Sequence, residues 1–321
     1  MRWISDRAMD QLRSHSGFPE IPGGRYQFVG EIGRGGMGTV YEAEDRELGR
    51  HVAVKILTVS SVEPQIAARM LREARIIASL EHPGIVPVHD VGALPDGRIY
   101  YTMKLVRGKR LDELDPVTPL TERLRILQRI CEAVGYAHSL GVIHRDLKPQ
   151  NIMLGAFGEV LVMDWGVAKL IEERGERNLQ DPALPKVGST DTGHGTVLGT
   201  PGFMAPEQER GAVNEIDRRT DVYGLGAILK SLVTRDENAG IPRPLRSIMS
   251  KAMAAEQEAR YPDAGVVALE IERFLDSLPV EAHHESLVER TLRWLRRYQA
   301  AVAIVVAYLA LRIVLFFLLG R

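Results

Sequence analysis

The sequence predicts an α+β fold in which a β-rich N-terminal part precedes a larger helical part, followed by one transmembrane helix. Three observations lead to this expectation. Short apolar runs bounded by glycine and polar residues recur between residues 26 and 106, as they do in strands. Apolar residues then follow at helical spacing from 120 to 138. The run 300–319 is 20 residues long with a single charge, which is the length that a bilayer core requires.

The composition excludes several classes of protein. With 321 residues the chain is long enough for two lobes with sizeable cores. Its formal net charge of -1 does not favour a nucleic-acid-binding protein, which is usually basic, so we expect no nucleic-acid partner. The single cysteine, Cys131, excludes an intrachain disulfide framework and fits a reducing compartment. No apolar run of signal-peptide length lies at the N-terminus, so export is not expected.

The first strands carry a glycine-rich turn. Residues 1–25 are predicted to form an N-terminal extension of a short helix and a linker, and a strand begins at Tyr26. Glycines at the first, third and sixth positions of 33–38 permit tight turns and bring backbone N–H groups near phosphate oxygens. A dinucleotide-binding turn has the same pattern, but it opens a helix. Because residues 39–43 are typical of a second strand, a hairpin is favoured.

A lysine and a glutamate follow the hairpin. The predicted strand 51–57 holds Lys55 among apolar neighbours, and the predicted helix from about 64 to 80 presents Glu73. We choose Glu73 as the carboxylate partner of Lys55, because Glu63 lies outside the helix and Glu81 lies at its end. The alternative, a solvated surface glutamate, stays open at this point.

The stretch 144–151 has the residue types that phosphoryl transfer needs. Asp146 offers a carboxylate that can accept a hydroxyl proton, and Lys148 an ammonium that can neutralise a moving phosphoryl group. The amide oxygen of Asn151 can hold a divalent cation. Thirteen residues further on, Asp164 follows an apolar run and precedes a Trp-Gly turn, where its carboxylate is well placed to take a second position on the metal.

These motifs together resemble the bacterial eukaryotic-like (Hanks-type) serine/threonine protein kinases, over residues 26–278. The resemblance implies a bilobal protein-kinase fold, ATP with Mg²⁺ (or Mn²⁺), and protein substrates that carry Ser or Thr. Met103 would be the gatekeeper, and Lys104 stands in the hinge where many members have Glu, which alters the charge at the pocket mouth. The implied nucleotide-binding residues are Ile32, Gly33, Arg34, Gly35, Gly36, Met37, Gly38, Val40, Ala53, Lys55, Met103, Lys104 and Val106.

The resemblance also implies the catalytic roles. Lys55, held by Glu73, would contact the α- and β-phosphates, and Asn151 and Asp164 would bind the metal. Asp146 would accept the proton of the substrate hydroxyl. Lys148 would stabilise the γ-phosphoryl group, and a lysine at this position is more typical of serine/threonine than of tyrosine kinases.

Further residues have structural or regulatory roles by the same resemblance. Asp221 would brace the catalytic-loop backbone, and Arg260 would pair with Glu207 at the end of the loop 199–207 that faces the substrate. His138, on the long core helix, is expected to be structural. Arg145, directly before the catalytic Asp, would receive a phosphate from the activation segment. The expected phosphosites are Thr192 and Thr196, with Ser189 and Thr190 further from the anchored end and Thr200 structural.

The C-terminal part is expected to be a membrane anchor. Four arginines with Trp294 and Tyr298 make 279–299 a basic juxtamembrane segment, which predicts a cytoplasmic kinase domain on a single-pass inner-membrane protein. Arg312 within 300–319 costs about 2.5–3.5 kcal/mol at a helix centre, which the aliphatic residues can offset. A buried amphipathic helix is the alternative, and an apolar surface on all sides argues against it.

Two other functions stay open. A membrane-anchored pseudokinase scaffold would bind nucleotide or partners without transferring phosphate. Its only support is Trp165, where the family usually has Phe, and the shortened segment 235–244, where it usually has a further helix. A small-molecule phosphotransferase would not need the loop 199–207 or Lys148 in this form. The protein substrate, the activating signal and the oligomeric state, a homodimer among the options, are not predicted.

Overall fold

The protein is described here from a computed structural model. The structure describes residues 18–35, 38–57, 74–165, 202–235, 240–286, 290–291 and 299–319, with side chains in the last helix from 302 to 312. Several predicted site residues lie outside these ranges: Gly36, Met37, Glu73, Thr192, Thr196 and the rest of the segment 166–201.

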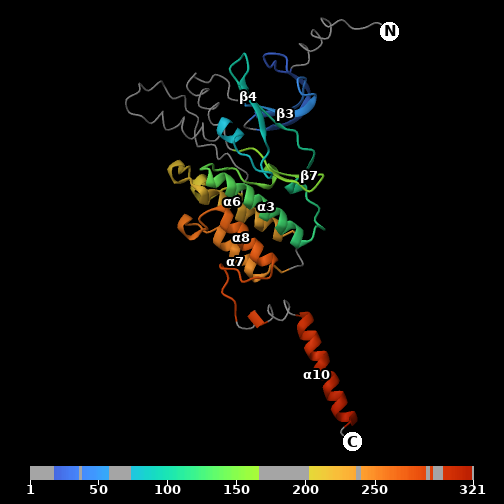
Figure 1. Ribbon diagram of the computed structural model, residues 1–321. Coiled ribbons are helices and arrows are strands. Elements are labelled where there is room, and N and C mark those ends of the chain that lie inside the picture. Colours follow the sequence, from blue (N-terminus) through green and yellow to red (C-terminus); the bar gives the residue numbers. More distant parts are fainter. Residues whose placement is uncertain are drawn as a thin grey trace, which may run out of the picture.

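The N-terminal lobe is built on a five-stranded antiparallel sheet in the order β1-β2-β3-β5-β4 (Figure 1). The central strand β3 is buried from Val52 to its end, as expected for an apolar strand covered on both faces. The residues before the sheet pack on it, because the Phe18 ring stacks on Phe28 with centroids 5.9 Å apart and Ile21 is buried. The strands are β1 (Tyr26–Gly35), β2 (Gly38–Asp45), β3 (Arg50–Leu57), β4 (Val88–Ala93) and β5 (Ile99–Lys104).

Helices form the C-terminal lobe, and the central one is α3 (Leu120–Ser139). One face of α3 is buried, including Leu124, Leu127 and Cys131, so the apolar stripe of the sequence marks the core as predicted. The helix contacts α6 and α8. The others are α5 (Pro206–Glu209), α6 (Arg218–Val233), α7 (Arg243–Ala252) and α8 (Ala264–Leu275).

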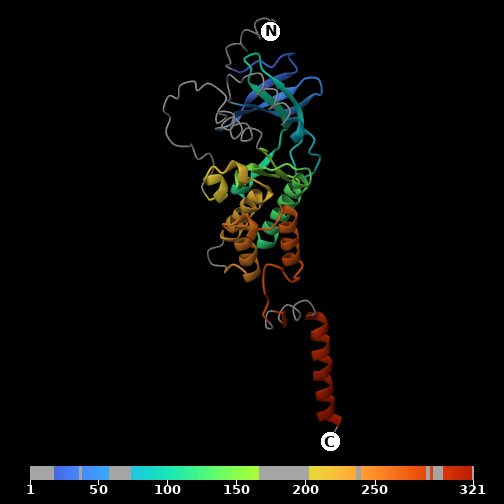
Figure 2. The same cartoon turned by 90° about the vertical axis from the view of Figure 1, so that its left-hand side faces the viewer.

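A small sheet lies where the two lobes meet. Its strands are ordered β6-β7-β8 and pair antiparallel. An isolated parallel bridge between Ile85 and Val162 ties the chain entering β4 to β8, so one apolar core continues from the sheet lobe into the helical lobe. Both views show the five-stranded sheet above and the helices of the C-terminal lobe below (Figure 2), and Figure 1 shows β7 between them. The strands are β6 (Gly108–Arg110), β7 (Ile152–Gly155) and β8 (Val160–Val162), and short 3₁₀ turns are η1 (Leu111–Glu113) and η2 (Pro149–Asn151).

The helix after α6 differs slightly from its prediction. The residues after the shortened segment 235–244 predict a helix from Leu245 to Ala255, whereas α7 begins at Arg243 and ends at Ala252. Pro242 precedes it, and Pro244 lies in its first turn, where a missing backbone N–H costs nothing. Across the shortened connection, Arg235 donates to the carbonyls of the 111–114 turn, including that of Leu111 at 3.0 Å. The side chain of Arg235 therefore fixes the end of α6 to the turn that follows β6.

The chain leaving α8 remains attached to the helical lobe. Buried Glu270 accepts hydrogen bonds from the backbone N–H groups of Glu281 and Ala282, both at 3.0 Å, and Val280 is buried. The last helix is α10 (Gln299–Leu319). Among the described residues, no helix is long and apolar enough to cross a membrane.

Candidate active site

The catalytic loop 140–151 runs from the end of α3 to β7 and is held by a buried carboxylate. Asp221, in the first turn of α6, accepts hydrogen bonds from the backbone N–H of His144 at 2.7 Å and of Arg145 at 2.8 Å. His138 contacts the same carboxylate at 2.9 Å. Burial raises the pKa of Asp221, but the hydrogen bonds from His138 and the backbone outweigh it, so the pKa lies below its usual range. The predicted bracing role of Asp221 is confirmed, and His138 is structural.

The loop brings three predicted residues together. The ammonium Nζ of Lys148 lies 3.0 Å from Oδ2 of Asp146. The amide Nδ2 of Asn151 donates to the same oxygen at 3.1 Å and to the backbone carbonyl of Asp146 at 2.7 Å. Because the amide nitrogen of Asn151 is committed to Asp146, its carbonyl oxygen is the atom that can ligate a cation. Within the catalytic loop, the carboxylate of Asp146 therefore lies next to the ammonium of Lys148 and the side-chain amide of Asn151.

Lys55 and Asp164 form an ion pair between the lobes. The Nζ of Lys55, on β3, lies 2.6 Å from Oδ1 of Asp164, which follows β8 in a left-handed backbone conformation with φ 57°. Burial lowers the pKa of Lys55, but Tyr101 and Asp164 outweigh it, so the pKa is raised and the ammonium stays charged. Lys55 is thus paired with Asp164, the carboxylate that would bind the metal by the resemblance. Its predicted partner Glu73 lies outside the described residues.

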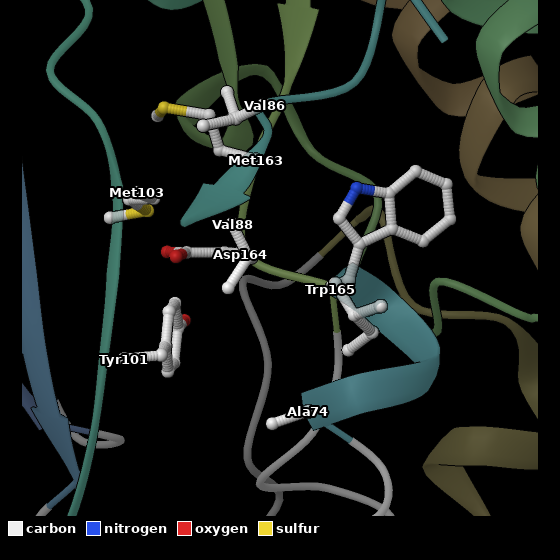
Figure 3. A pocket seen from close by; sticks show the side chains of 9 residues that line it. Ala74, Val86, Val88, Tyr101, Met103, Met163, Asp164 and Trp165 are labelled. Atoms are coloured by element: carbon white, nitrogen blue, oxygen red, sulfur yellow. The ribbon is translucent and has the colours of Figure 1, made fainter. Parts of the chain in front are cut away.

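A pocket opens behind the gatekeeper position. Met103 and Tyr101 project into it from β5, and Figure 3 shows the Asp164 carboxylate pointing toward this strand. In the β3–β5 register Lys55 stands opposite Tyr101 and Ala53 opposite Met103. The phenol of Tyr101 is buried, which raises its pKa. The other lining residues are Ala74, Ile77, Val86, Val88, Met163 and Trp165.

The glycine-rich hairpin has two kinds of glycine. An added Cβ on Gly38 would lie 2.2 Å from the backbone oxygen of Ile56, so packing of β2 on β3 demands glycine there. A Cβ on Gly33 or Gly35 would meet no described atom within 4 Å. Packing does not explain these two glycines, whereas close approach of phosphate oxygens to the backbone does. Ile32, next to them, is half exposed.

Of the predicted nucleotide residues that the structure describes, Met103 lines this pocket, and the others lie outside its lining. Val40 stands opposite Lys55 in the β2–β3 register and is partly buried. Lys104 lies 4.0 Å from Glu159 of the β7–β8 hairpin, and Arg34 pairs with Glu31 at 2.7 Å on the exposed hairpin. Val106 packs against the core. Lys104 is thus partly neutralised at the pocket mouth.

A pair of metal ligands fits the chemistry of magnesium. Among the described residues no group of three or more His, Cys, Asp or Glu side chains could hold a metal ion. Mg²⁺ is usually bound through one or two protein ligands together with substrate phosphates and water, rather than by an all-protein cage. Asn151 and Asp164 are such a pair, so the donor set suits a metal that arrives with a nucleotide.

A buried ion pair lies at the end of the loop 199–207, which faces the substrate by the resemblance. Both guanidinium nitrogens of Arg260 reach the carboxylate of Glu207, at 2.8 and 2.9 Å, and the hydroxyl of Thr220 donates to it at 2.8 Å. Burial raises the pKa of Glu207, but the hydrogen bonds from Arg260 and its neighbours lower it to about 2. The predicted pairing of Arg260 with Glu207 is confirmed.

Some residues of the site were not predicted. Tyr101 faces Lys55 across the sheet, and alternation along β5 could have indicated this. Gln208 donates to the backbone carbonyl of Arg145 at 2.7 Å, and no sequence pattern marked it. The indole of Trp165 is buried with its ring 4.8 Å from that of His144, so the larger ring fills the expected apolar position.

Comparisons with known proteins agree with this geometry. The family model described as protein kinase domain matches residues 26–283. The serine/threonine-protein kinase PknD of Protochlamydia amoebophila (strain UWE25) is 34% identical over 311 residues, which is 83% of this chain and 31% of that protein. PknD of Chlamydia muridarum is 42% identical over 233 residues, covering 65% of this chain and 24% of that protein. The chain therefore spans about a third or less of these relatives.

A solved structure has the same fold. The crystal structure of the Mycobacterium tuberculosis PknI kinase domain superposes with a TM-score of 0.57 at 25% sequence identity. The match covers 79% of this chain and 97% of that one. The two-lobed architecture described above is thus shared over nearly the whole of that domain.

Proposed function

This chain belongs to the protein kinase family, and we propose that it transfers the γ-phosphoryl group of ATP to serine and threonine hydroxyls of proteins. The observation that carries the proposal is the convergence of Asp146, Lys148 and Asn151 on one braced loop, with contacts of 3.0 and 3.1 Å. The two PknD relatives are named serine/threonine-protein kinases, which supports the proposal.

The residues present support a mechanism of positioning and charge neutralisation. The carboxylate of Asp146 accepts the proton of the substrate hydroxyl as its oxygen attacks the γ-phosphorus, while the bond from that phosphorus to the β–γ bridging oxygen breaks and ADP leaves. Lys148, already 3.0 Å from that carboxylate, neutralises charge on the moving phosphoryl group. Mg²⁺, held by Asn151 and Asp164, would neutralise the phosphate oxygens. Lys55 orients the α- and β-phosphates.

The Lys55–Asp164 contact satisfies two charged groups in the cleft between the lobes. Their side chains neutralise each other at 2.6 Å, where Lys55 is 8% exposed and Asp164 is 32% exposed. An isolated buried ammonium or carboxylate would be costly, so the pair satisfies both. With ATP and Mg²⁺ bound, Lys55 would hold phosphate oxygens and Asp164 would hold the metal, so each group would still face an opposite charge.

The pseudokinase alternative has little support. Trp165 is 5% exposed and its ring lies 4.8 Å from that of His144, so the unusual side chain fills a buried apolar position beside Asp164, although its Nε1 has no hydrogen-bond partner among the described residues. At the start of the shortened connection after α6, Arg235 donates to the carbonyl of Leu111 at 3.0 Å, which fixes the end of α6 to the turn after β6. Every described catalytic position carries the residue that transfer requires.

We further propose that residues 300–319 anchor the kinase domain to the inner membrane from the cytoplasmic side. The apolar run of 20 residues and the four arginines before it support the proposal. Among the described side chains of α10, Ile304 is 70% exposed and Val305 is 55% exposed, so this part of the helix has an exposed apolar surface. An apolar helix surface that does not pack on protein suits contact with lipid.

Incubation of the purified full chain with labelled ATP, Mg²⁺ and a generic serine/threonine protein substrate tests the activity. We expect the wild type to label itself and the substrate, and Asp146→Asn to do neither. Asp276→Asn, which makes the same change at the exposed end of α8, is the matched control and should keep wild-type activity. Equal labelling by Asp146→Asn and wild type would refute the assignment.

A further inference from the structure

The side chain of Gln208 bridges two functional loops. Gln208 lies in α5, directly after Glu207. Its Nε2 donates to the backbone carbonyl of Arg145 at 2.7 Å, and its Oε1 accepts the backbone N–H of Ala205 at 3.2 Å. Ala205 lies in the substrate-facing loop 199–207, directly before α5, and Arg145 precedes the catalytic Asp146. One amide group thus links the two loops.

The backbone at Arg145 needs support. Its φ of 67° lies in the left-handed region, which a non-glycine residue adopts only when its surroundings hold it there. Asp221 holds the N–H of Arg145 at 2.8 Å, and Gln208 holds its carbonyl. On the other side of the same peptide, the N–H of Asp146 lies 3.3 Å from Nδ1 of His144. The peptide plane that leads into Asp146 is therefore fixed by Gln208 on its carbonyl side.

The amide of Gln208 is itself held firmly. The preceding residue, Glu207, is 1% exposed and bound by both guanidinium nitrogens of Arg260. Gln208 and the carbonyl it binds line a small pocket together with Lys148 and Met204. Because α5 is anchored to the helical lobe, its side-chain amide offers a rigid donor rather than a mobile one.

We propose that Gln208 is a positioning residue for phosphoryl transfer. By binding the carbonyl of Arg145, it sets the peptide that orients the carboxylate of Asp146 toward the substrate hydroxyl. Because Gln208 also binds the backbone N–H of Ala205, it couples the orientation of the Asp146 carboxylate to the position of the substrate-facing loop. The inference rests on the proposed kinase activity, to which it adds a residue that does not contact substrate, nucleotide or metal.

A purely local role for Gln208 is the alternative. Its bond to the N–H of Ala205 is the reciprocal half of a capping arrangement at the start of α5, where Glu and Gln serve equally well. Capping requires only the side-chain oxygen. The hydrogen bond to Arg145 requires the amide nitrogen, which capping does not use. A Gln208→Glu substitution therefore separates the two roles, because it keeps the capping oxygen and removes the donor.

The experiment compares the full chain with its Gln208→Glu, Gln208→Leu and Arg129→Met variants. Arg129 is the matched control, since it also donates to a backbone carbonyl, that of Gly158, at 2.7 Å but on the surface. Steady-state kinetics with a serine/threonine peptide give kcat and KM. Thermal shift in the presence of ATP and Mg²⁺ gives the nucleotide affinity, and thermal unfolding without ligand gives the Tm of each variant.

We expect kcat to fall about 10- to 100-fold in both Gln208 variants, as for a catalytic group misplaced by a fraction of an ångström to an ångström. The KM for ATP and the nucleotide affinity should stay near wild type, and Gln208→Glu should keep the wild-type Tm. Arg129→Met should keep the wild-type kcat.

Wild-type kcat in Gln208→Glu would overturn the inference and leave Gln208 as a helix cap. A change confined to the KM for the peptide would overturn it as well, by placing the effect in substrate binding. An inactive wild type would instead refute the proposed activity, so the two failures are distinguishable.

Discussion

Removing one partner of the Glu207–Arg260 ion pair should destabilise the helical lobe strongly. The two side chains are 1% and 0% exposed and share two hydrogen bonds, at 2.8 and 2.9 Å. Arg260→Met leaves a carboxylate buried without its counter-ion, a change that typically costs about 3–5 kcal/mol. At about 2–4 °C per kcal/mol for a domain of this size, Tm should fall by about 6–20 °C.

The pKa of Glu207 is shifted in the same direction. Its fall from 4.5 to about 2 sums the effect of burial with the hydrogen bonds from Arg260, Gln257 and Thr220, and the whole shift corresponds to about 3 kcal/mol. A carboxyl whose pKa is lowered on folding stabilises the native state above its unfolded pKa. The stabilisation from Glu207 is therefore complete above about pH 4.5 and is lost as the pH falls toward about 2. In Arg260→Met, the loss of stability over this pH range should be missing.

Thermal melts at pH 7 and pH 4, monitored by circular dichroism, test both statements. The double variant Glu207→Leu/Arg260→Met removes both charges and should recover much of the lost Tm, because no unpaired charge remains. Arg210→Met, which breaks an exposed pair with Glu215 at 3.1 Å, is the control and should shift Tm by less than about 2 °C. A Tm for Arg260→Met within about 2 °C of wild type would refute the reasoning.

Three further outcomes are expected. Lys55→Met and Asp146→Asn should each abolish transfer in a kinase assay while circular dichroism shows a folded protein, because both groups act on charge or protons and not on the core. The full chain should sediment with membranes and a chain truncated before 300–319 should not; solubility of both at low and high salt would contradict the anchor. Mass spectrometry after incubation with ATP should find phosphate on Thr192 or Thr196, and the double alanine variant should be less active, because a phosphothreonine adds about -1.5 to -2 charges that a guanidinium can bind. An unphosphorylated segment together with full activity of the double variant would exclude this activation.

Much of the fold was predictable because its signals are local. The strand around Lys55 and the long core helix with Cys131 follow from apolar spacing, which depends only on neighbours in the sequence. The brace by Asp221 and the pair of Glu207 with Arg260 were predicted by resemblance and confirmed by distances of 2.7 to 2.9 Å. Element ends were less certain, as α7 shows, because tertiary packing and prolines decide where a helix stops.

Contacts between distant segments could not be predicted in the same way. The ion pair of Lys55 with Asp164 joins residues 109 positions apart and depends on how the two lobes meet. The hydrogen bond from Gln208 to Arg145 depends on one backbone carbonyl in a left-handed turn, which a sequence pattern does not encode. Tyr101 reaches Lys55 through strand register, which follows only once the sheet order is known.

Phosphoamino-acid analysis of the full chain after incubation with γ-labelled ATP and Mg²⁺ tests the central claim most directly. The account predicts label in phosphoserine and phosphothreonine of the kinase and of an added protein substrate, and none in the Asp146→Asn variant. A thermal shift should show in the same samples that both proteins bind the nucleotide. Nucleotide binding by the wild type without any labelled hydroxyl would contradict the account and identify a protein that binds ATP but does not transfer its phosphate.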